Sequence, residues 1–328
     1  MGSKRKRLGL LLLHWLPALA AAERSHLVVT LGVFSMAGEH SMRALLRTTW
    51  MASPLACKSV PLEPRRNATA LTAAAPQPVQ DSTCVAHPLF VLGRAVEPET
   101  SAATRAALAA ELEQHGDLLL LDSRENMDEG KIFDWFRLAP ALYPGSDYIG
   151  RVDSDTYLDL RALLAQVQAS PVEPFLCYGF ALDSRTLQGI AWGTPTQRWF
   201  LSGEFVLMGR GLAAWLARQN LTRADTHGPS HTDDLLFGRY LTRHDGNGHT
   251  TVFRTCYRRW VSLHAGLTPE RRRRCPFTHR LKSEEAQQAQ HIVTMQDRGA
   301  ITAADVLLLM AATGLLVAGV RTLRVRRR

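Results

Sequence analysis

Two aspartates separated by one residue, Asp153 and Asp155, follow a short apolar run at residues 148–152. A run of this length predicts a buried strand. At the end of a strand, carboxylates spaced in this way can point toward one place, and such hard oxygen ligands suit Mg²⁺ or Mn²⁺. Because an ion of this kind commonly binds substrate phosphate oxygens as well, the pattern predicts a site for a metal-bound nucleotide diphosphate. The alternative is a solvated Asx-turn that closes the strand.

The elements that must position these aspartates alternate along the chain. Alternation of apolar strands with helices predicts an α/β domain whose central sheet is mostly parallel. Ligands bind beyond the carboxyl ends of the strands in such sheets, and both aspartates lie at such an end. Strands are predicted at residues 26–34, 88–93, 117–122 and 148–152, and helices at residues 41–50, 99–115, 129–142 and 158–169. In the less regular second half, strands are predicted at residues 175–182 and 204–208, and helices at residues 211–219 and 233–241.

The composition allows one large core or two small ones, since 46% of the 328 residues are hydrophobic and 21% are charged. The formal net charge of +9 is concentrated in basic clusters at residues 4–7, 271–274 and 321–328. A nucleic-acid binder more often spreads basic residues along one element and interleaves them with aromatic residues. Two of the clusters adjoin apolar segments instead. This placement indicates a membrane as partner, and no nucleic-acid partner is expected.

Both ends of the chain carry an apolar segment. Residues 8–22 have the form of a signal peptide, either cleaved or retained as a signal-anchor. Residues 301–320 are long enough to cross a membrane, the alternative being an amphipathic or core helix. The positive-inside rule places both basic ends in the cytosol. We therefore expect a signal segment at residues 1–22, a lumenal domain at residues 23–298, and a transmembrane helix with a basic tail at residues 299–328.

The sequons and cysteines fit a lumenal position. Asn67 and Asn220 each begin a sequon and would be glycosylation sites there. Residues 53–83 are rich in Pro, Ala, Thr and Gln, which predicts an inserted surface loop. Cys57 and Cys84 bracket this loop, and they either staple it or stay as free thiols. The other possible disulfide cysteines are Cys256 and Cys275.

Four stretches of the chain occur in an order that resembles a known family. They are residues 43–50 (RALLRTTW), 90–93 (FVLG), 151–157 (RVDSDTY) and 232–238 (TDDLLFG). The chain resembles the β-1,3-glycosyltransferase family of the secretory pathway (family 31, galactosyl- and N-acetylglucosaminyltransferases). That family carries R-x-x-x-R-x-T-W, F-x-x-G, K-x-D-D-D-x-F and E-D-V-x-x-G blocks in the same order. The resemblance spans about residues 26–265, most of the predicted lumenal domain.

Three residues depart from the family pattern. Arg151 replaces the usual lysine, Ser154 replaces the middle aspartate, and Asp233 replaces the glutamate. Asp153 and Asp155 keep the two carboxylates of the D-x-D pattern, so these departures do not threaten metal binding.

The resemblance implies a GT-A fold, a Rossmann-like α/β domain, and an inverting transfer of galactose or N-acetylglucosamine. The donor would be a UDP-sugar, and the acceptor a hydroxyl of a glycan or glycoconjugate, joined in β-1,3 linkage. The resemblance also implies Mn²⁺ or Mg²⁺ as cofactor and a Golgi membrane location with a lumenal catalytic domain. By this match Asp155 binds the metal, Asp153 supports the metal and the ribose, and Asp234 is the base. An alternative for Asp234 is a helix N-terminal aspartate that interacts with the dipole, a role that Asp233 would fill equally well.

The remaining site residues are also carried over from the resemblance. A histidine near the end of the domain often completes the metal site of related enzymes, which makes His264 the candidate, although a lone histidine is more often structural. Arg43 and Arg47 follow the first predicted strand, where they either contact the nucleotide or lie on a surface helix face. The expected nucleotide-sugar contacts are Arg43, Arg47, Arg151 and Asp153, and the expected acceptor-side residues are Gly203 and Glu204.

Two other functions compete with this interpretation. A haloacid-dehalogenase-like phosphatase also begins with D-x-D at a strand end, but it needs Thr or Val at the position that Tyr157 occupies. A GT-A-like domain without catalytic activity could serve as a sugar-binding or chaperone module. Hydrolysis of a UDP-sugar in the presence of Mn²⁺ separates all three functions.

Overall fold

The computed structural model describes most of the predicted lumenal domain. The described residues are 27–60, 75–78, 84–95, 101–125, 129–169, 172–183, 199–228, 233–245, 251–256, 275–279 and 281–297. The predicted signal segment, the predicted transmembrane helix, Asn67 and His264 lie outside them. No helix among the described residues is long and apolar enough to cross a membrane.

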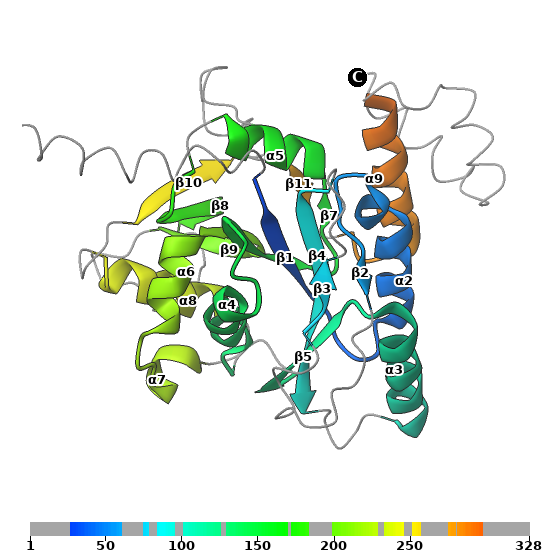
Figure 1. Cartoon of the computed structure of the whole chain (residues 1–328), viewed down its shortest axis with the longest axis horizontal. Helices are drawn as coiled ribbons and strands as arrows, with labels where there is room; N and C mark the ends of the chain where they lie inside the picture. The colour runs from blue at the N-terminus through cyan, green and yellow to red at the C-terminus, as the bar shows by residue number, and fades with distance from the viewer. Residues whose placement is uncertain are drawn as a thin grey trace, which may run out of the picture.

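A single large sheet forms the centre of the fold (Figure 1). Within the described part of the chain it has seven strands in the order β10-β8-β9-β6-β1-β4-β5. All neighbours in this order pair in parallel except β9, which is antiparallel to β6 and to β8. The prediction of a mostly parallel α/β sheet is therefore confirmed. The strands are β1 (Val29–Phe34), β4 (Ala86–Ala95), β5 (Leu118–Arg124), β6 (Tyr148–Asp153), β8 (Leu176–Asp183), β9 (Trp199–Gly209) and β10 (Val252–Cys256).

Helices cover both faces of the sheet, α4, α6 and α8 on one side and α2, α3 and α9 on the other (Figure 1). Strand β4 shows why both faces are buried. Phe90 and Leu92 belong to one core cluster, whereas Leu89 and Val91 belong to the other, as the two-residue period of a strand requires. The helices are α2 (His40–Thr48), α3 (Ala102–His115), α4 (Lys131–Leu142), α5 (Leu160–Gln168), α6 (Arg210–Ala217), α7 (Arg223–Thr226), α8 (Asp233–Arg243) and α9 (Glu284–Asp297).

Local sequence explains where the helices begin and end. The hydroxyl of Ser101 accepts a hydrogen bond from the Thr104 amide and so caps α3, and Gly116 ends this helix in the left-handed conformation with φ 61°. Asp159 caps α5 in the same way, through a bond from the Ala162 amide. Such caps satisfy backbone groups that would otherwise lack partners. Each predicted helix is observed to within a few residues, whereas α7 and α9 were not predicted.

The region predicted as an inserted loop is tied to the sheet by a disulfide. Cys57 and Cys84 are bonded with their Cα atoms 4.9 Å apart, which confirms the predicted staple. Two short antiparallel strands lie within the loop, β2 (Ser59–Val60) and β3 (Gln77–Pro78). Cys275 is also disulfide-bonded, whereas the side chain of Cys256 lies outside the described residues.

Candidate active site

The site begins where β6 ends. After Asp153 the chain turns and forms β7 (Tyr157–Leu158), which pairs antiparallel with β11 (Phe277–Thr278). The amide of Leu281 also donates a hydrogen bond to the carbonyl of Asp155, at 3.0 Å. These backbone contacts bring the residue that follows β11, His279, beside the two predicted metal ligands, although more than a hundred residues separate them in sequence.

Asp153, Asp155 and His279 form a group that could hold a metal ion, because one ligand atom from each lies within 4.8 Å of the others. The His279 Nε2 atom is 3.0 Å from an oxygen of Asp155 and 3.9 Å from an oxygen of Asp153. Adjacent ligands of an octahedral ion with bonds of about 2.1 Å are about 3.0 Å apart, so the separation of His279 from Asp155 fits Mg²⁺ or Mn²⁺, whereas that from Asp153 is longer. Two carboxylates and one imidazole are also ligand types that suit these ions.

His279 was not predicted from the sequence, which pointed to His264 instead. The signal was weak, because a two-residue strand such as β11 leaves little pattern. The run Cys275-Pro-Phe-Thr-His279 has no clear alternation of apolar and polar residues, and only the pairing of β11 with β7 shows where the histidine lies. The role of His264 remains a prediction, since it lies outside the described residues.

Arg151 connects the metal group, as Asp153, Asp155 and His279 are called from here on, to the start of α8. Its side chain is fully buried, and it donates hydrogen bonds to Asp153 at 3.1 and 3.3 Å and to Asp233 at 2.6 Å. Its guanidinium also lies over the ring of Phe34, 4.7 Å from the centroid. The predicted contact of Arg151 with a nucleotide-sugar remains a prediction. What the structure shows is a guanidinium already engaged by two carboxylates.

Burial and charge move the pKa values of the two aspartates in opposite directions. For Asp153, burial raises the pKa and outweighs the opposing charge of Arg151. For Asp155, burial also acts to raise the pKa, but the hydrogen bond and charge of His279, together with the charge of Lys282, bring it below its ordinary value. A divalent cation bound beside both carboxylates would act in the same direction as these positive charges and lower both pKa values.

Asp233 and Asp234 have different surroundings although they are adjacent. Asp233 is buried, and its carboxylate is held by Arg151. Asp234 accepts hydrogen bonds only from backbone amides in this part of the structure, from Gly203 at 3.1 Å and from Leu235 at 2.7 Å. Burial, followed by the nearby charge of Asp233, raises the pKa of Asp234 to about 6. A carboxylate with that pKa is suited to take a proton near neutral pH, so the geometry favours Asp234 over Asp233 as a base.

Gly203 and Glu204 lie on β9, directly beside these groups. The Gly203 amide orients Asp234, as described above. The Glu204 side chain is buried, and one of its oxygens lies 2.7 Å from the Nδ1 atom of His279. The predicted acceptor-side role of both residues remains a prediction, but the described contacts of Glu204 face the metal group.

Arg43 and Arg47 lie in ion pairs between helices. Arg43 is fully buried, and its five N–H groups donate to Glu111, Ser35 and the carbonyls of residues 36 and 37. Arg47 pairs with Asp117 and Glu111 at 2.7 Å and lies over the ring of Phe90. With every donor engaged, Arg43 offers none to a nucleotide, which corrects the expectation of a direct contact. It instead holds α2, α3 and the loop after β1 together.

The turn between Asp153 and Asp155 is tied to the loop after β1. Glu39 accepts hydrogen bonds from Ser154 at 3.0 Å, from the Met36 amide at 3.0 Å and from Ser35 at 2.9 Å. The side-chain amide of Gln287 on α9 also donates a hydrogen bond to the backbone carbonyl of Ser154, at 3.3 Å. Ser154 is one of the departures from the family pattern. The aspartate of that pattern would place its carboxylate against that of Glu39, whereas the hydroxyl of Ser154 donates a hydrogen bond to Glu39.

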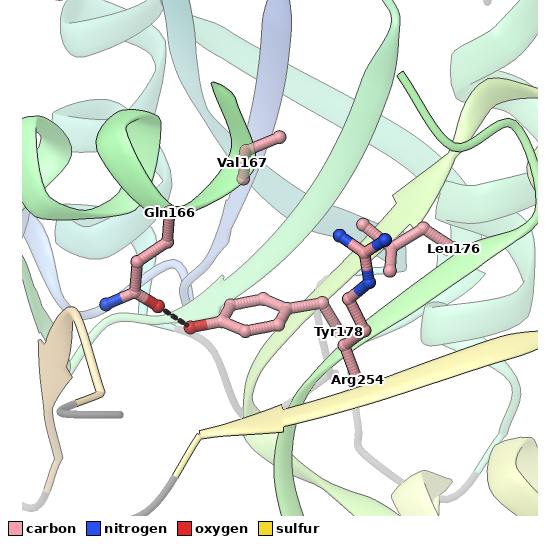
Figure 2. A pocket seen from close by; sticks show the side chains of 5 residues that line it. All are labelled: Gln166, Val167, Leu176, Tyr178 and Arg254. Atoms are coloured by element: carbon pink, nitrogen blue, oxygen red, sulfur yellow. Dashed lines mark hydrogen bonds between the residues drawn. The ribbon is translucent and has the colours of Figure 1, made fainter. Parts of the chain in front are cut away.

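A separate small pocket lies between α5, β8 and β10, as Figure 2 shows. Tyr178 and Gln166 line it and are joined by a hydrogen bond of 2.5 Å, with Arg254 beside them. None of the residues of the metal group, and neither Asp233 nor Asp234, lines this pocket. It is therefore distinct from the candidate active site.

Comparison with known proteins agrees with the resemblance seen in the motifs. The model of the galactosyltransferase family matches residues 41–199, which include three of the four motif stretches but neither Asp234 nor His279. A search of curated proteins gives no match.

Solved structures of glycosyltransferases are similar to this chain at a low level. The galactosyltransferase LgtC, solved with donor and acceptor sugar analogs, has a TM-score of 0.39 and 12% identity, covering 77% of this chain and 86% of its own. Mouse xyloside xylosyltransferase 1 has a TM-score of 0.33 and 12% identity, covering 77% and 97%. With TM-scores and identities this low, neither structure supports a conclusion about this chain. The family match confirms the resemblance, and residues 41–199 belong to the galactosyltransferase family.

Proposed function

We propose that this glycosyltransferase is an inverting, metal-dependent enzyme that transfers galactose or N-acetylglucosamine from a UDP-sugar. The acceptor is a hydroxyl of a glycan or glycoconjugate, and the linkage is β-1,3. The observation that carries the proposal is the position of Arg151, which hydrogen-bonds Asp153 of the metal group and Asp233 beside Asp234. A diphosphate-binding metal site and a general base are thereby held as one unit, which an inverting transfer requires.

Each side chain has a defined part in this reaction. Asp153, Asp155 and His279 would hold the divalent ion, which would supply positive charge to offset the charge that grows on the leaving diphosphate. Asp234 takes the proton of the acceptor hydroxyl as its oxygen attacks the anomeric carbon from the face opposite UDP. The bond from the sugar to UDP breaks as the new glycosidic bond forms. Because one displacement occurs, the configuration at the anomeric carbon inverts.

The proposed location is the Golgi membrane, with the catalytic domain in the lumen and both termini in the cytosol. The disulfide between Cys57 and Cys84 supports an oxidising compartment. Asn220 is exposed, as a glycosylation site must be. Protease treatment of sealed vesicles tests the topology. A C-terminal tag should be digested while the lumenal domain is protected, and protection of the tag would exclude a C-terminal span.

Turnover of nucleotide sugars tests the catalytic proposal. The purified chain should release UDP from UDP-galactose or UDP-N-acetylglucosamine with Mn²⁺, and EDTA should abolish the release. Asp155→Ala should abolish it too while leaving the fold intact, because a strand-end carboxylate contributes little packing. Glu113→Ala, which removes an exposed carboxylate of α3, is the matched control and should retain activity.

The same assay separates the competing functions. A sugar-binding module would bind the UDP-sugar without releasing UDP. A haloacid-dehalogenase-like phosphatase would instead release phosphate from simple phosphate monoesters. Full Mn²⁺-dependent activity in the Asp155→Ala variant would show that the metal assignment is wrong.

A further inference from the structure

A carboxylate outside the metal group lies against its histidine. Glu204 is 3% exposed, and its Oε2 atom is 2.7 Å from Nδ1 of His279. An ionised carboxylate can only accept hydrogen bonds, so the proton of this contact belongs to Nδ1. In a neutral imidazole the other nitrogen, Nε2, then carries a lone pair.

That lone pair faces the aspartates. Nε2 is 3.0 Å from Asp155 and 3.9 Å from Asp153, both of which present acceptor oxygens. A lone pair and a carboxylate repel each other at this distance unless a proton or a cation lies between them. In the neutral imidazole the contact with Glu204 therefore selects the tautomer whose Nε2 lone pair can bind a metal ion, and a cation there would replace the proton that otherwise lies between Nε2 and Asp155.

The fold holds Glu204 and His279 at a set distance. In the antiparallel pairing of β9 with β6, Phe205 lies opposite Val152. Continuing this register by one residue places Glu204 opposite Asp153 on the neighbouring strand. Phe205 also packs against Phe277, with ring centroids 4.9 Å apart. Because Glu204 precedes Phe205 and His279 lies two residues after Phe277, this aromatic contact fixes the separation of the carboxylate and the imidazole.

We propose that Glu204 is a positioning residue, which fixes the tautomer and ring orientation of His279 and so presents Nε2 to a divalent cation shared with Asp153 and Asp155. The inference rests on the proposed metal-dependent function. Carboxylates that accept the second N–H of a ligating histidine raise the basicity of the ligand, and their loss typically weakens metal binding about 10–100-fold. Glu204 thus acts through His279 and does not touch the metal or the donor itself.

Calorimetric titration of the purified full chain with Mn²⁺ tests the proposal. Glu204→Ala should weaken Mn²⁺ binding by about 10–100-fold. Glu204→Gln should weaken it less, because an amide oxygen can still accept from Nδ1. Glu113→Ala should bind as the wild type does, and His279→Ala should show the loss of a ligand. Nitrogen-15 NMR of His279 without metal, at mildly alkaline pH, should show the proton on Nδ1 in the wild type.

Each outcome decides the question. Unchanged Mn²⁺ affinity in a folded Glu204→Ala variant, while Asp155→Ala loses binding, would overturn this inference and leave the proposed function standing. A wild type that binds no Mn²⁺ would overturn both. If Glu204→Ala does not fold, the tautomer in the wild type still decides, since a proton on Nε2 instead of Nδ1 contradicts the proposal.

Discussion

The guanidinium of Arg151 occupies space that Gly203 leaves free by having no side chain. A Cβ atom at position 203 would lie 2.8 Å from one terminal nitrogen of Arg151 and 3.0 Å from its Cζ atom. The guanidinium cannot move aside at little cost, because Asp153 and Asp233 bind it on two sides and Phe34 packs on its face. Because the Gly203 amide also donates to Asp234, Gly203 links the candidate metal group, Asp234 and β9.

Gly203→Ala should therefore disturb catalysis through Arg151. We expect overpacking to reduce the free energy of unfolding by about 1–3 kcal/mol and to lower both Mn²⁺ affinity and kcat. Thermal unfolding, Mn²⁺ titration and UDP release are the measurements. Gly145→Ala is the control, because a Cβ atom there meets no other atom within 4 Å. Full activity in Gly203→Ala would show that Arg151 has room to shift.

Asp234→Asn should lower kcat by about 10²–10⁴-fold, because the amide keeps the shape but cannot take a proton. Affinity for the UDP-sugar should change little, since the base contacts the acceptor. The measurements are kcat and the Kd for UDP-sugar. Loss of UDP-sugar binding would instead assign Asp234 to the donor site.

Asp233→Asn should act on stability more than on chemistry. It leaves the buried Arg151 with a weaker partner, and loss of a charged hydrogen bond costs about 1.5–3 kcal/mol. This cost exceeds the effect of a helix dipole on an exposed aspartate. Chemical denaturation and kcat separate the two effects, and a larger kcat loss than in Asp234→Asn would reverse the assignment of the base.

The pKa of Asp234 also predicts how activity depends on pH. Since burial raises this pKa to about 6 and the base must be ionised, kcat should fall as the pH drops through about 6. The contribution of Asp234 to the stability of the fold changes with pH in the opposite direction to kcat. The folded state holds the proton more tightly than the unfolded chain, so this group stabilises the fold at low pH, and that contribution is lost as pH rises through about 6. A kcat that stays constant well below pH 6 would contradict a role for Asp234 as base.

Ser154→Asp should weaken the site although it restores the residue of the family pattern. The new carboxylate would meet Glu39, which now accepts the hydroxyl of Ser154 at 3.0 Å. Like charges at such a distance repel, so Mn²⁺ affinity and stability should both fall. Glu39→Gln should restore part of the loss in the double variant, and the absence of any coupling between the two substitutions would contradict this explanation.

Arg43→Met should destabilise the fold without weakening the donor site. Removing one partner of a buried ion pair costs about 3–5 kcal/mol, and Glu111 would keep only Arg47. The Kd for UDP-sugar of the folded variant should match that of the wild type. A large rise in that Kd, with the fold intact, would restore Arg43 as a nucleotide contact.

The sequence by itself determined most of the central elements and two of the three residues of the metal group. Apolar runs of strand length and helical segments between them predicted β1, β4, β5, β6 and the helices that follow, because these patterns are local. The spacing of Asp153 and Asp155 is local as well, so both were identified, and the cysteines that bracket a polar loop pointed to the observed disulfide.

Only the tertiary structure decided the rest of the site. His279 reaches Asp155 because β11 pairs with β7, and a pairing between strands so distant in sequence leaves no periodic signal. The direction of β9, antiparallel among parallel neighbours, places Gly203 against Arg151 and Glu204 against His279. Burial then separated Asp233, held by Arg151, from Asp234, whose pKa is raised. Desolvation and long-range ion pairs depend on the whole fold, and a pattern of residue types does not encode them directly.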